Sequence, residues 1–247
     1  MPQKKSELIA LLVDGDNAQA SLLKPIIEEV SKYGKVTIRR IYGDWTSTGM
    51  SSWKKVVNDV SFTPIQKFSY TTGKNSTDSS LIIDAMDILY AGNVDGFCIV
   101  SSDSDYTGLA KRIREEGIFV MGIGEKKTPA AFVQSCEIFT FIETIAGEQK
   151  AAAQERVTPS RKVAAPAAPK ADPEIINKAF EASESEEEDA YVSTVGSQIR
   201  RLDPSFDVRS FGYRTLTQLL KKTNGYEVFY KESNGDRQPM VRRARGK

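Results

Sequence analysis

The chain has 247 residues, of which 40% are hydrophobic, a formal net charge of +1 and no histidine. This length suits one large domain or two smaller ones, and the apolar content is enough for a real hydrophobic core. Without histidine, the chain has neither a histidine base nor a histidine metal ligand. No stretch approaches the ~20 apolar residues of a membrane span, and the first apolar run is too short for a signal peptide. We therefore expect a soluble protein of the cytoplasm.

The two cysteines, Cys98 and Cys136, both lie in apolar runs. No CxxC pair or other metal-binding spacing is present, so we interpret them as buried thiols. Low cysteine use is typical of a reducing compartment, which agrees with the expected location.

The first 145 residues alternate between strand-like and helix-like segments. The expected strands are residues 8–13, 36–42, 63–68, 96–100, 118–122 and 138–142. The expected helices are residues 22–33, 51–60, 77–91, 107–116 and 129–135. Short strands separated by helices predict βαβ units, that is, an α/β fold with a parallel sheet and helices on both faces. The unbroken apolar runs at 8–13 and 97–100 are typical of central strands.

Aspartates directly follow two of these strands. Asp14 and Asp16 follow the first strand, and Asp103 and Asp105 follow the fourth. Open parallel sheets bind ligands beyond the carboxyl ends of their strands, so these carboxylates are expected at one edge. Carboxylates gathered in this way suit hard divalent cations such as Mg²⁺, and such sites usually act on phosphate esters.

Asp78 stands at the start of the third expected helix, on the line of its apolar stripe. It is either a partner of the helix dipole or a member of the same crevice as Asp14 and Asp103. A helix cap explains one aspartate at such a turn, but three converging segments favour a site. Asn17 either orients Asp14 or caps the next helix. Asp84, further along the same helix, is interpreted as an exposed carboxylate, as is Asp87.

Three motifs carry a resemblance to a known family. They are Leu-Val-Asp-Gly-Asp-Asn at 12–17, Ser-Thr-Asp at 76–78 and Val-Ser-Ser-Asp-Ser-Asp-Tyr at 100–106. With the stretch 109–117, they resemble the NYN family, which has a PIN-like nuclease fold, although family members often carry an aliphatic residue where Thr77 stands. The resemblance implies a metal-dependent ribonuclease that uses Mg²⁺ or Mn²⁺. The implied metal ligands are Asp14, Asp78, Asp103 and Asp105, and we add Asp16 and Asn17 to the catalytic group.

Basic and aromatic residues near this site are candidates for RNA contacts. Arg39, Arg40 and Lys74 are expected either to hold the phosphate backbone or to be ordinary surface charges. Trp45 and Trp53 could each stack a base, although core packing is expected for at least one of them.

The composition changes after residue 147. Residues 151–170 are rich in alanine and proline, so we predict a flexible linker at 148–170 between a nuclease domain at 1–147 and a second domain at 171–247. Apolar residues in the second domain recur at helical spacing, on faces formed by Val192, Val195, Ile199 and Leu202 and by Leu216, Leu219 and Leu220. Two β-rich runs then flank Asn-Gly at 234–235, a hairpin turn signal. Helices followed by a hairpin form a winged helix.

The run Asp203–Tyr213 and the helix after it resemble the OST-HTH/LOTUS domain, over residues 171–245. The resemblance implies a winged helix that binds RNA or a protein partner such as a helicase. Residues 190–247 carry 12 Lys and Arg against five acids, which itself suggests a polyanionic partner. The candidate phosphate contacts are Arg209, Arg214, Lys221, Lys222, Arg242, Arg243 and Arg245.

Two other functions were weighed against a ribonuclease. A haloacid-dehalogenase-like phosphatase shares the Asp-Gly-Asp of residues 14–16, but that family needs a lysine loop and a wider acidic pair than Asp103 and Asp105. A non-catalytic RNA-binding adaptor on a decayed nuclease fold is the other alternative, and the presence of all four candidate ligands argues against decay. The sequence leaves open the RNA substrate, the polarity of cleavage, action on DNA, and pairing into a homodimer.

Overall fold

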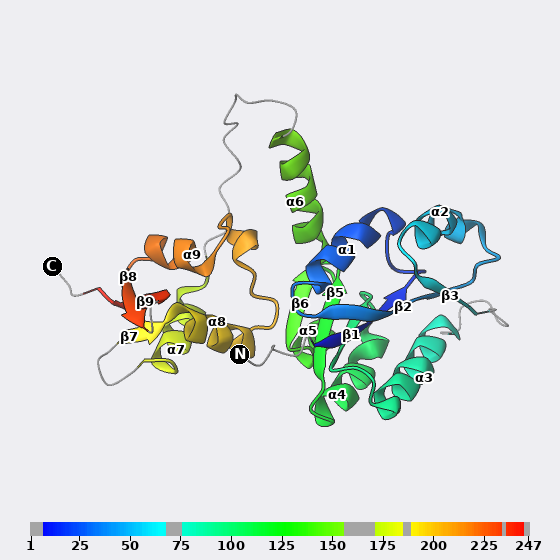
Figure 1. Ribbon diagram of the computed structural model, residues 1–247, viewed down its shortest axis with the longest axis horizontal. Coiled ribbons are helices and arrows are strands. Elements are labelled where there is room, and N and C mark those ends of the chain that lie inside the picture. Colours follow the sequence, from blue (N-terminus) through cyan, green and yellow to red (C-terminus); the bar gives the residue numbers. More distant parts are fainter. Residues whose placement is uncertain (1–6, 68–75, 156–170, 185–188, 234–235, 245–247) are drawn as a thin grey trace. The chain divides into compact units, whose positions relative to one another are not determined.

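A computed structural model describes residues 7–67, 76–155, 171–184, 189–233 and 236–244. The chain divides into two units, Met1–Thr158 and Pro159–Lys247 (Figure 1). The first unit is an α/β fold and the second is a small helical domain with an antiparallel sheet. Both expected fold classes are therefore confirmed. Within the described residues, no helix is both long and apolar enough to cross a membrane.

The first unit contains a six-stranded sheet in which every pair of neighbours is parallel. Its strands are β1 (Leu8–Asp14), β2 (Lys35–Gly43), β3 (Thr63–Gln66), β4 (Gly96–Val100), β5 (Phe119–Gly124) and β6 (Ile138–Phe141). They lie in the order β3-β2-β1-β4-β5-β6. The chain first runs outward from β1 to β3 and then returns to β4 on the other side of β1. The strand order therefore reverses between β1 and β4, the position where open sheets bind ligands.

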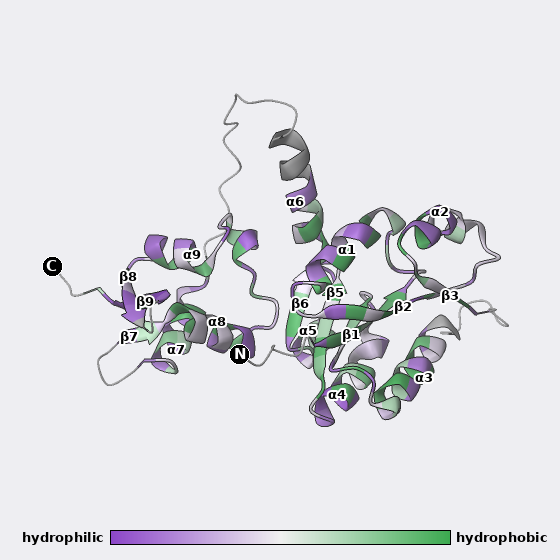
Figure 2. Ribbon diagram, viewed as in Figure 1, coloured by the Kyte–Doolittle hydropathy of each residue, from purple (hydrophilic) through white to green (hydrophobic). Residues whose placement is uncertain are grey.

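Helices cover both faces of this sheet. They are α1 (Leu23–Val30), α2 (Ser51–Asp59), α3 (Ser76–Ala91), α4 (Thr107–Glu115), α5 (Ala130–Ser135) and α6 (Ile142–Glu155), with short 3₁₀ turns η1 (Ala20–Leu22), η2 (Thr48–Met50) and η3 (Ser104–Tyr106). Alternate residues of a strand point to opposite faces. Accordingly, Leu11 of β1 packs with α1, α2 and α6, whereas Leu12 packs with α3, α4 and α5. Figure 2 shows the apolar character of β1.

The second unit has a core of its own, formed by residues such as Phe180, Val195, Leu220 and Val241. Its elements are α7 (Pro173–Glu181), β7 (Asp189–Tyr191), α8 (Val192–Leu202), η4 (Val208–Phe211), α9 (Leu216–Lys222), β8 (Tyr226–Ser233) and β9 (Asp236–Arg243). The sheet order is β7-β9-β8, with antiparallel pairs. The expected helices and hairpin strands are present, and the Asn-Gly turn between the strands lies outside the described residues.

Several boundaries differ from the expectations. Helix α6 begins at Ile142, directly after β6, and continues to Glu155, so the linker predicted from residue 148 starts inside a helix. Alanine is the strongest helix former, and the alanines there extend the helix without needing an apolar face. Leu202, expected on a buried face, is 47% exposed because it is the last residue of α8. Strand β7 was not expected, because a strand of three residues is too short to show an alternation of apolar and polar side chains.

Gly122 of β5 leaves no room for a side chain. An added Cβ would lie 2.4 Å from Cδ2 of Phe139 and 2.9 Å from Sγ of Cys136. We predict that Gly122→Ala lowers the free energy of unfolding of the first unit by roughly 1–3 kcal/mol, the usual cost of overpacking. Both tryptophans of the chain, Trp45 and Trp53, lie in this unit, so their fluorescence during denaturant unfolding measures the change.

The matched control is Gly147→Ala in α6, where an added Cβ meets nothing within 4 Å. Alanine is favoured over glycine inside a helix by roughly 0.5–1 kcal/mol, so this variant should be as stable as the wild type or more stable. An unchanged unfolding midpoint in Gly122→Ala would contradict the packing described for β5 and β6.

Candidate metal centre

Asp14 is the last residue of β1, and its side chain is fully buried. Its Oδ2 accepts hydrogen bonds from Nδ2 of Asn17 at 2.7 Å and from Oγ of Ser101 at 2.8 Å. Burial raises the pKa of the Asp14 carboxyl, the two side-chain hydrogen bonds oppose that rise, and the charges of Asp78 and Asp16 add to it. Asn17 therefore orients Asp14 and does not cap the next helix, since the N-cap residue of η1 is Gln19.

The backbone beside Asp14 packs too closely for a side chain on Gly15. An added Cβ there would lie 2.8 Å from the carbonyl oxygen of Tyr42. The N–H of Gly15 donates to that same carbonyl, and its own carbonyl accepts from Nε1 of Trp53 at 3.1 Å. Trp53 is fully buried, so the core role expected for at least one tryptophan is confirmed.

The turn after β4 carries the next two aspartates. Oγ of Ser101 accepts from the N–H of Asp103 at 3.1 Å, and Oδ1 of Asp103 accepts from the N–H of Asp105 at 2.9 Å, which caps η3. Tyr106, the last residue of η3, is fully buried, and its hydroxyl donates to Oδ1 of Asp78 at 2.7 Å. One short segment therefore carries two carboxylates and also anchors a third, at the start of α3.

The three carboxylates gather closely. Among the described residues, Asp78, Asp103 and Asp105 each place one carboxylate oxygen within 4.8 Å of the oxygens of the other two. Oxygens bound to one divalent cation at roughly 2.1–2.5 Å lie at most about 4–5 Å apart, so these three are close enough to share an ion. Burial raises the pKa of Asp78, the Tyr106 hydroxyl lowers it, and the charges of Asp103, Asp105 and Asp16 raise it further.

Asp14 lies outside this group of three but is tied to it through Ser101 and interacts electrostatically with Asp78. Asp16 is exposed, and its Oδ1 lies near the backbone of Gly43. All the aspartates predicted for the site thus lie around the switch point between β1 and β4. Their individual roles as ligands or catalytic groups stay predictions.

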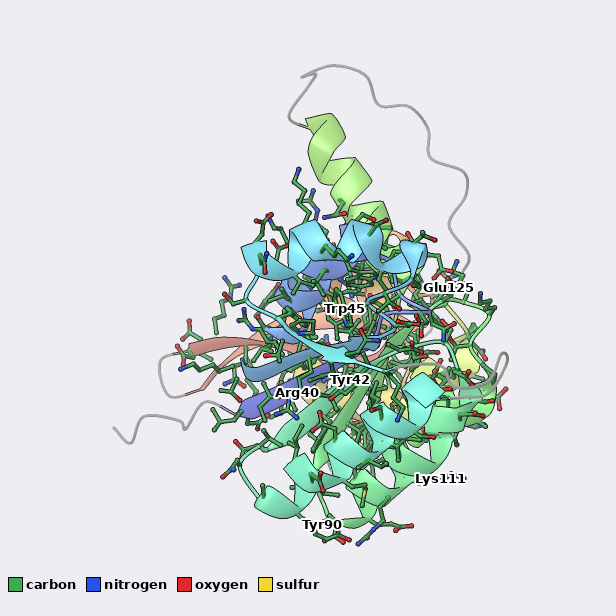
Figure 3. All side chains as sticks on the ribbon, turned by 90° about the vertical axis from the view of Figure 1, so that its right-hand side faces the viewer. Arg40, Tyr42, Trp45, Tyr90, Lys111 and Glu125 are labelled. Carbon is green, nitrogen blue, oxygen red and sulfur yellow. The ribbon has the colours of Figure 1, made fainter. Side chains whose placement is uncertain are left out.

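The basic residues predicted beside the site have other partners. Nη1 of Arg39 donates to the carbonyl of Val60 at 3.1 Å. Arg40 forms an ion pair with Asp84, which also accepts a hydrogen bond from the Tyr42 hydroxyl. Arg40 and Tyr42 lie on β2, and Figure 3 views the molecule from this side. The interpretation of Asp84 as an exposed carboxylate is therefore wrong, because α3 packs over β2.

Lys74, the third basic residue predicted here, lies outside the described residues. Trp45 is half-buried just after β2, where its Nε1 donates to the carbonyl of Ile65 at 3.1 Å (Figure 3). Ser101 and Tyr106 were not singled out from the sequence, although they bracket Asp103 and Asp105 within one motif. Their hydroxyl groups act by contacts between separate segments, and no local pattern reveals such contacts.

Both units of the chain match known domain families. Residues 8–143 match the NYN domain and residues 170–238 match the OST-HTH/LOTUS domain. Since the first match spans more than half of the chain, the protein belongs to the NYN family, a PIN-like ribonuclease family. The order of the two domains confirms the resemblance found in the sequence.

Three similar proteins are described as uncharacterized or of unknown function. An uncharacterized protein of Methanocaldococcus jannaschii, MJ0482, is 27% identical over 127 residues, which cover 49% of this chain and 49% of that protein. This chain therefore matches about half the length of that relative. A structure of a protein of unknown function from Vibrio parahaemolyticus, VPA0982, covers 57% of this chain and 96% of its own, with 20% identity and a TM-score of 0.49. An uncharacterized protein of Nitrosomonas europaea, NE0665, covers 36% and 90%, with 24% identity and a TM-score of 0.31.

Repulsion among the three carboxylates predicts opposite effects of Asp103→Asn with and without metal. Without metal, removing one charge should leave the free energy of unfolding of the first unit unchanged or raise it by on the order of 1 kcal/mol. With Mn²⁺ at a hundredfold excess over its Kd, the wild type should gain about 2.7 kcal/mol, and the variant should lose most of that gain. Thermal unfolding followed by tryptophan fluorescence measures both effects.

The matched control is Asp87→Asn, which removes the same charge from an exposed position further along α3. This variant should keep the full Mn²⁺ effect. Equal stabilisation of the wild type and Asp103→Asn by Mn²⁺ would show that the cluster does not bind the ion.

The raised pKa of Asp78 predicts a pH dependence in the metal-free protein. Because its pKa in the folded state lies above the unperturbed 3.8, the folded protein holds this proton more tightly than the unfolded chain does. The charged carboxylate thus lowers stability at neutral pH, and this loss disappears as the pH falls through the folded-state pKa. Asp78→Asn should be more stable than the wild type near pH 7, and denaturant titrations should show the difference shrinking towards about pH 4. A difference that grows on acidification would contradict the account.

Proposed function

We propose that this NYN-family protein is a metal-dependent ribonuclease, with a C-terminal domain that binds RNA. The observation that carries the proposal is the gathering of Asp78, Asp103 and Asp105, from two separate segments, at the switch point of the sheet. Carboxylates that repel one another are retained at a ligand-binding position when a cation offsets their charge.

The donor set fits Mg²⁺ or Mn²⁺. Asp78, Asp103 and Asp105 offer hard carboxylate oxygens, which these ions prefer, and Asp14 is the fourth proposed ligand. A divalent cation held there would polarise a phosphoryl oxygen and lower the pKa of bound water, which supplies a nucleophile without a histidine base.

The chain's own groups hold the carboxylates in place. Asn17 and Ser101 fix the Asp14 carboxylate, and the Tyr106 hydroxyl fixes Asp78. Burial raises the pKa values of Asp14 and Asp78 in the metal-free protein, and a cation bound between these carboxylates would offset that rise by favouring their charged forms. Fixed side chains lose little freedom when substrate binds, which is the usual basis of an efficient site.

The second domain is proposed to supply RNA to the nuclease domain. The exposed cations Arg214, Lys221 and Lys222 lie in or just before α9, and phosphate contacts of this kind give salt-dependent binding with little sequence preference. Two binding domains in one chain raise the local concentration of RNA at the nuclease site. A protein partner such as a helicase, and pairing of two copies, stay predictions from the family resemblance.

Cleavage of labelled single-stranded and structured RNAs tests the enzymatic proposal. The wild type should produce fragments with Mn²⁺ or Mg²⁺ and none with EDTA. Asp103→Asn should lower the rate by about 100-fold or more, because several kcal/mol of transition-state stabilisation depend on the ion. Asp87→Asn should cleave like the wild type, and the fragment pattern distinguishes endonuclease from exonuclease action.

Two results would contradict the proposal that this site cleaves RNA. No cleavage by any variant, with salt-dependent RNA binding intact, would leave an RNA-binding adaptor. Cleavage that survives in EDTA and in Asp103→Asn would come from something other than this site.

A further inference from the structure

The second domain presents an exposed tyrosine with two cations over its ring. Tyr230 lies on β8 and is 43% exposed. Nζ of Lys221 lies 5.5 Å from the centroid of its ring, and Cζ of Arg237 lies 4.9 Å from it. Lys221 belongs to the last turn of α9 and Arg237 to β9, so three elements converge on this ring.

The strand register explains the exposure of Tyr230. Val228 pairs with Val241, which belongs to the core of the domain, and Val228 is partly buried against that core. Tyr230 is two residues further along β8, so it points to the same face of the sheet, beyond the edge of that core. Arg237 lies two residues from the cross-strand partner of Tyr230, Pro239, and is therefore its diagonal neighbour on this face.

Several other cations of this domain are already neutralised. Arg209 pairs with Asp207, Arg242 with Glu227 at 2.8 Å, and Arg243 with Glu181 at 2.6 Å. A phosphate would have to compete with these acids.

Lys221 and Arg237 differ, because no ion pair within the described part of the chain involves either of them. Glu232 is the cross-strand partner of Arg237 in the register, but the two form no ion pair. Among the described residues, positive charge without an acidic partner therefore lies over the ring of Tyr230.

We propose that Tyr230, Lys221 and Arg237 form a binding site for an unpaired RNA base and its flanking phosphates. An aromatic face beside cations is the chemistry that binds single-stranded nucleic acid, since every base has a face that can stack. An apolar partner would desolvate the two cations without pairing them, whereas a polyanion pairs them. The proposal rests on the RNA-binding part of the proposed function and not on cleavage.

The site selects the form of RNA. Bases inside a duplex are stacked on their neighbours and cannot reach Tyr230, whereas bases in loops and single strands can. The second domain would therefore bring unpaired segments of RNA to the nuclease.

Binding of a single-stranded RNA that contains 2-aminopurine tests the site, with the full chain in EDTA so that the RNA stays intact. The wild type should quench the fluorescence of the probe. Tyr230→Leu should bind roughly tenfold more weakly and lose most of the quenching, because it lacks the stacking ring. Tyr230→Phe keeps the ring and should behave like the wild type.

The matched control is Tyr191→Leu, which removes another exposed tyrosine of the same domain, 37% exposed on β7. It should bind and quench like the wild type. The double substitution Lys221→Gln with Arg237→Gln should reduce the slope of log affinity against log salt by about 1.4, roughly 0.7 for each lost phosphate contact with a single strand. This variant also tests the site if Tyr230→Leu fails to fold.

Equal affinity and quenching in Tyr230→Leu and the wild type would overturn the proposal, as would an unchanged salt slope in the double variant. Failure of the wild type to bind single-stranded RNA at all would also overturn it and would favour a protein-binding role for the domain. None of these outcomes bears on metal-dependent cleavage, which Asp103→Asn tests separately.

Discussion

A single hydroxyl group joins the two halves of the first domain at its candidate site. Oγ of Ser101 donates to the buried Asp14 carboxylate at the end of β1 and accepts from the N–H of Asp103 after β4. Tyr106 extends this connection to α3 by its bond to Asp78. The chain of hydrogen bonds therefore holds carboxylates from three segments close together against their mutual repulsion. Burying Asp14 without such partners would cost several kcal/mol.

The fold brings these negatively charged side chains together, and their mutual repulsion is the reason to expect that they bind a cation. The sheet reverses its strand order between β1 and β4, so the ends of both strands and the start of α3 open onto the same edge. Proteins place destabilising arrangements of this kind at functional sites. The cations of the second domain fall into two groups. Arg209, Arg242 and Arg243 form ion pairs with acidic residues. Lys221 and Arg237 instead lie over the ring of Tyr230.

The sequence predicts the strands, and the positions of aspartates at their carboxyl ends, because both are local signals. The unbroken apolar runs of β1 and β4 identify central strands, and the aspartates that follow them mark the ligand-binding edge. Contacts between distant segments are not local, so the partners of Ser101, Tyr106 and Asp84 could not be predicted. For the same reason, Arg242 and Lys221 look equivalent in the sequence, and only the pairing of Arg242 with Glu227 across the hairpin separates them.

The position of a bound ion tests the central claim most directly. Crystals of the chain soaked in Mn²⁺ would reveal the ion by its anomalous scattering. The account predicts a peak among the carboxylates of Asp78, Asp103 and Asp105, and its absence from crystals of Asp103→Asn. A wild-type map with no peak at these carboxylates, or with a peak only elsewhere, would contradict the account.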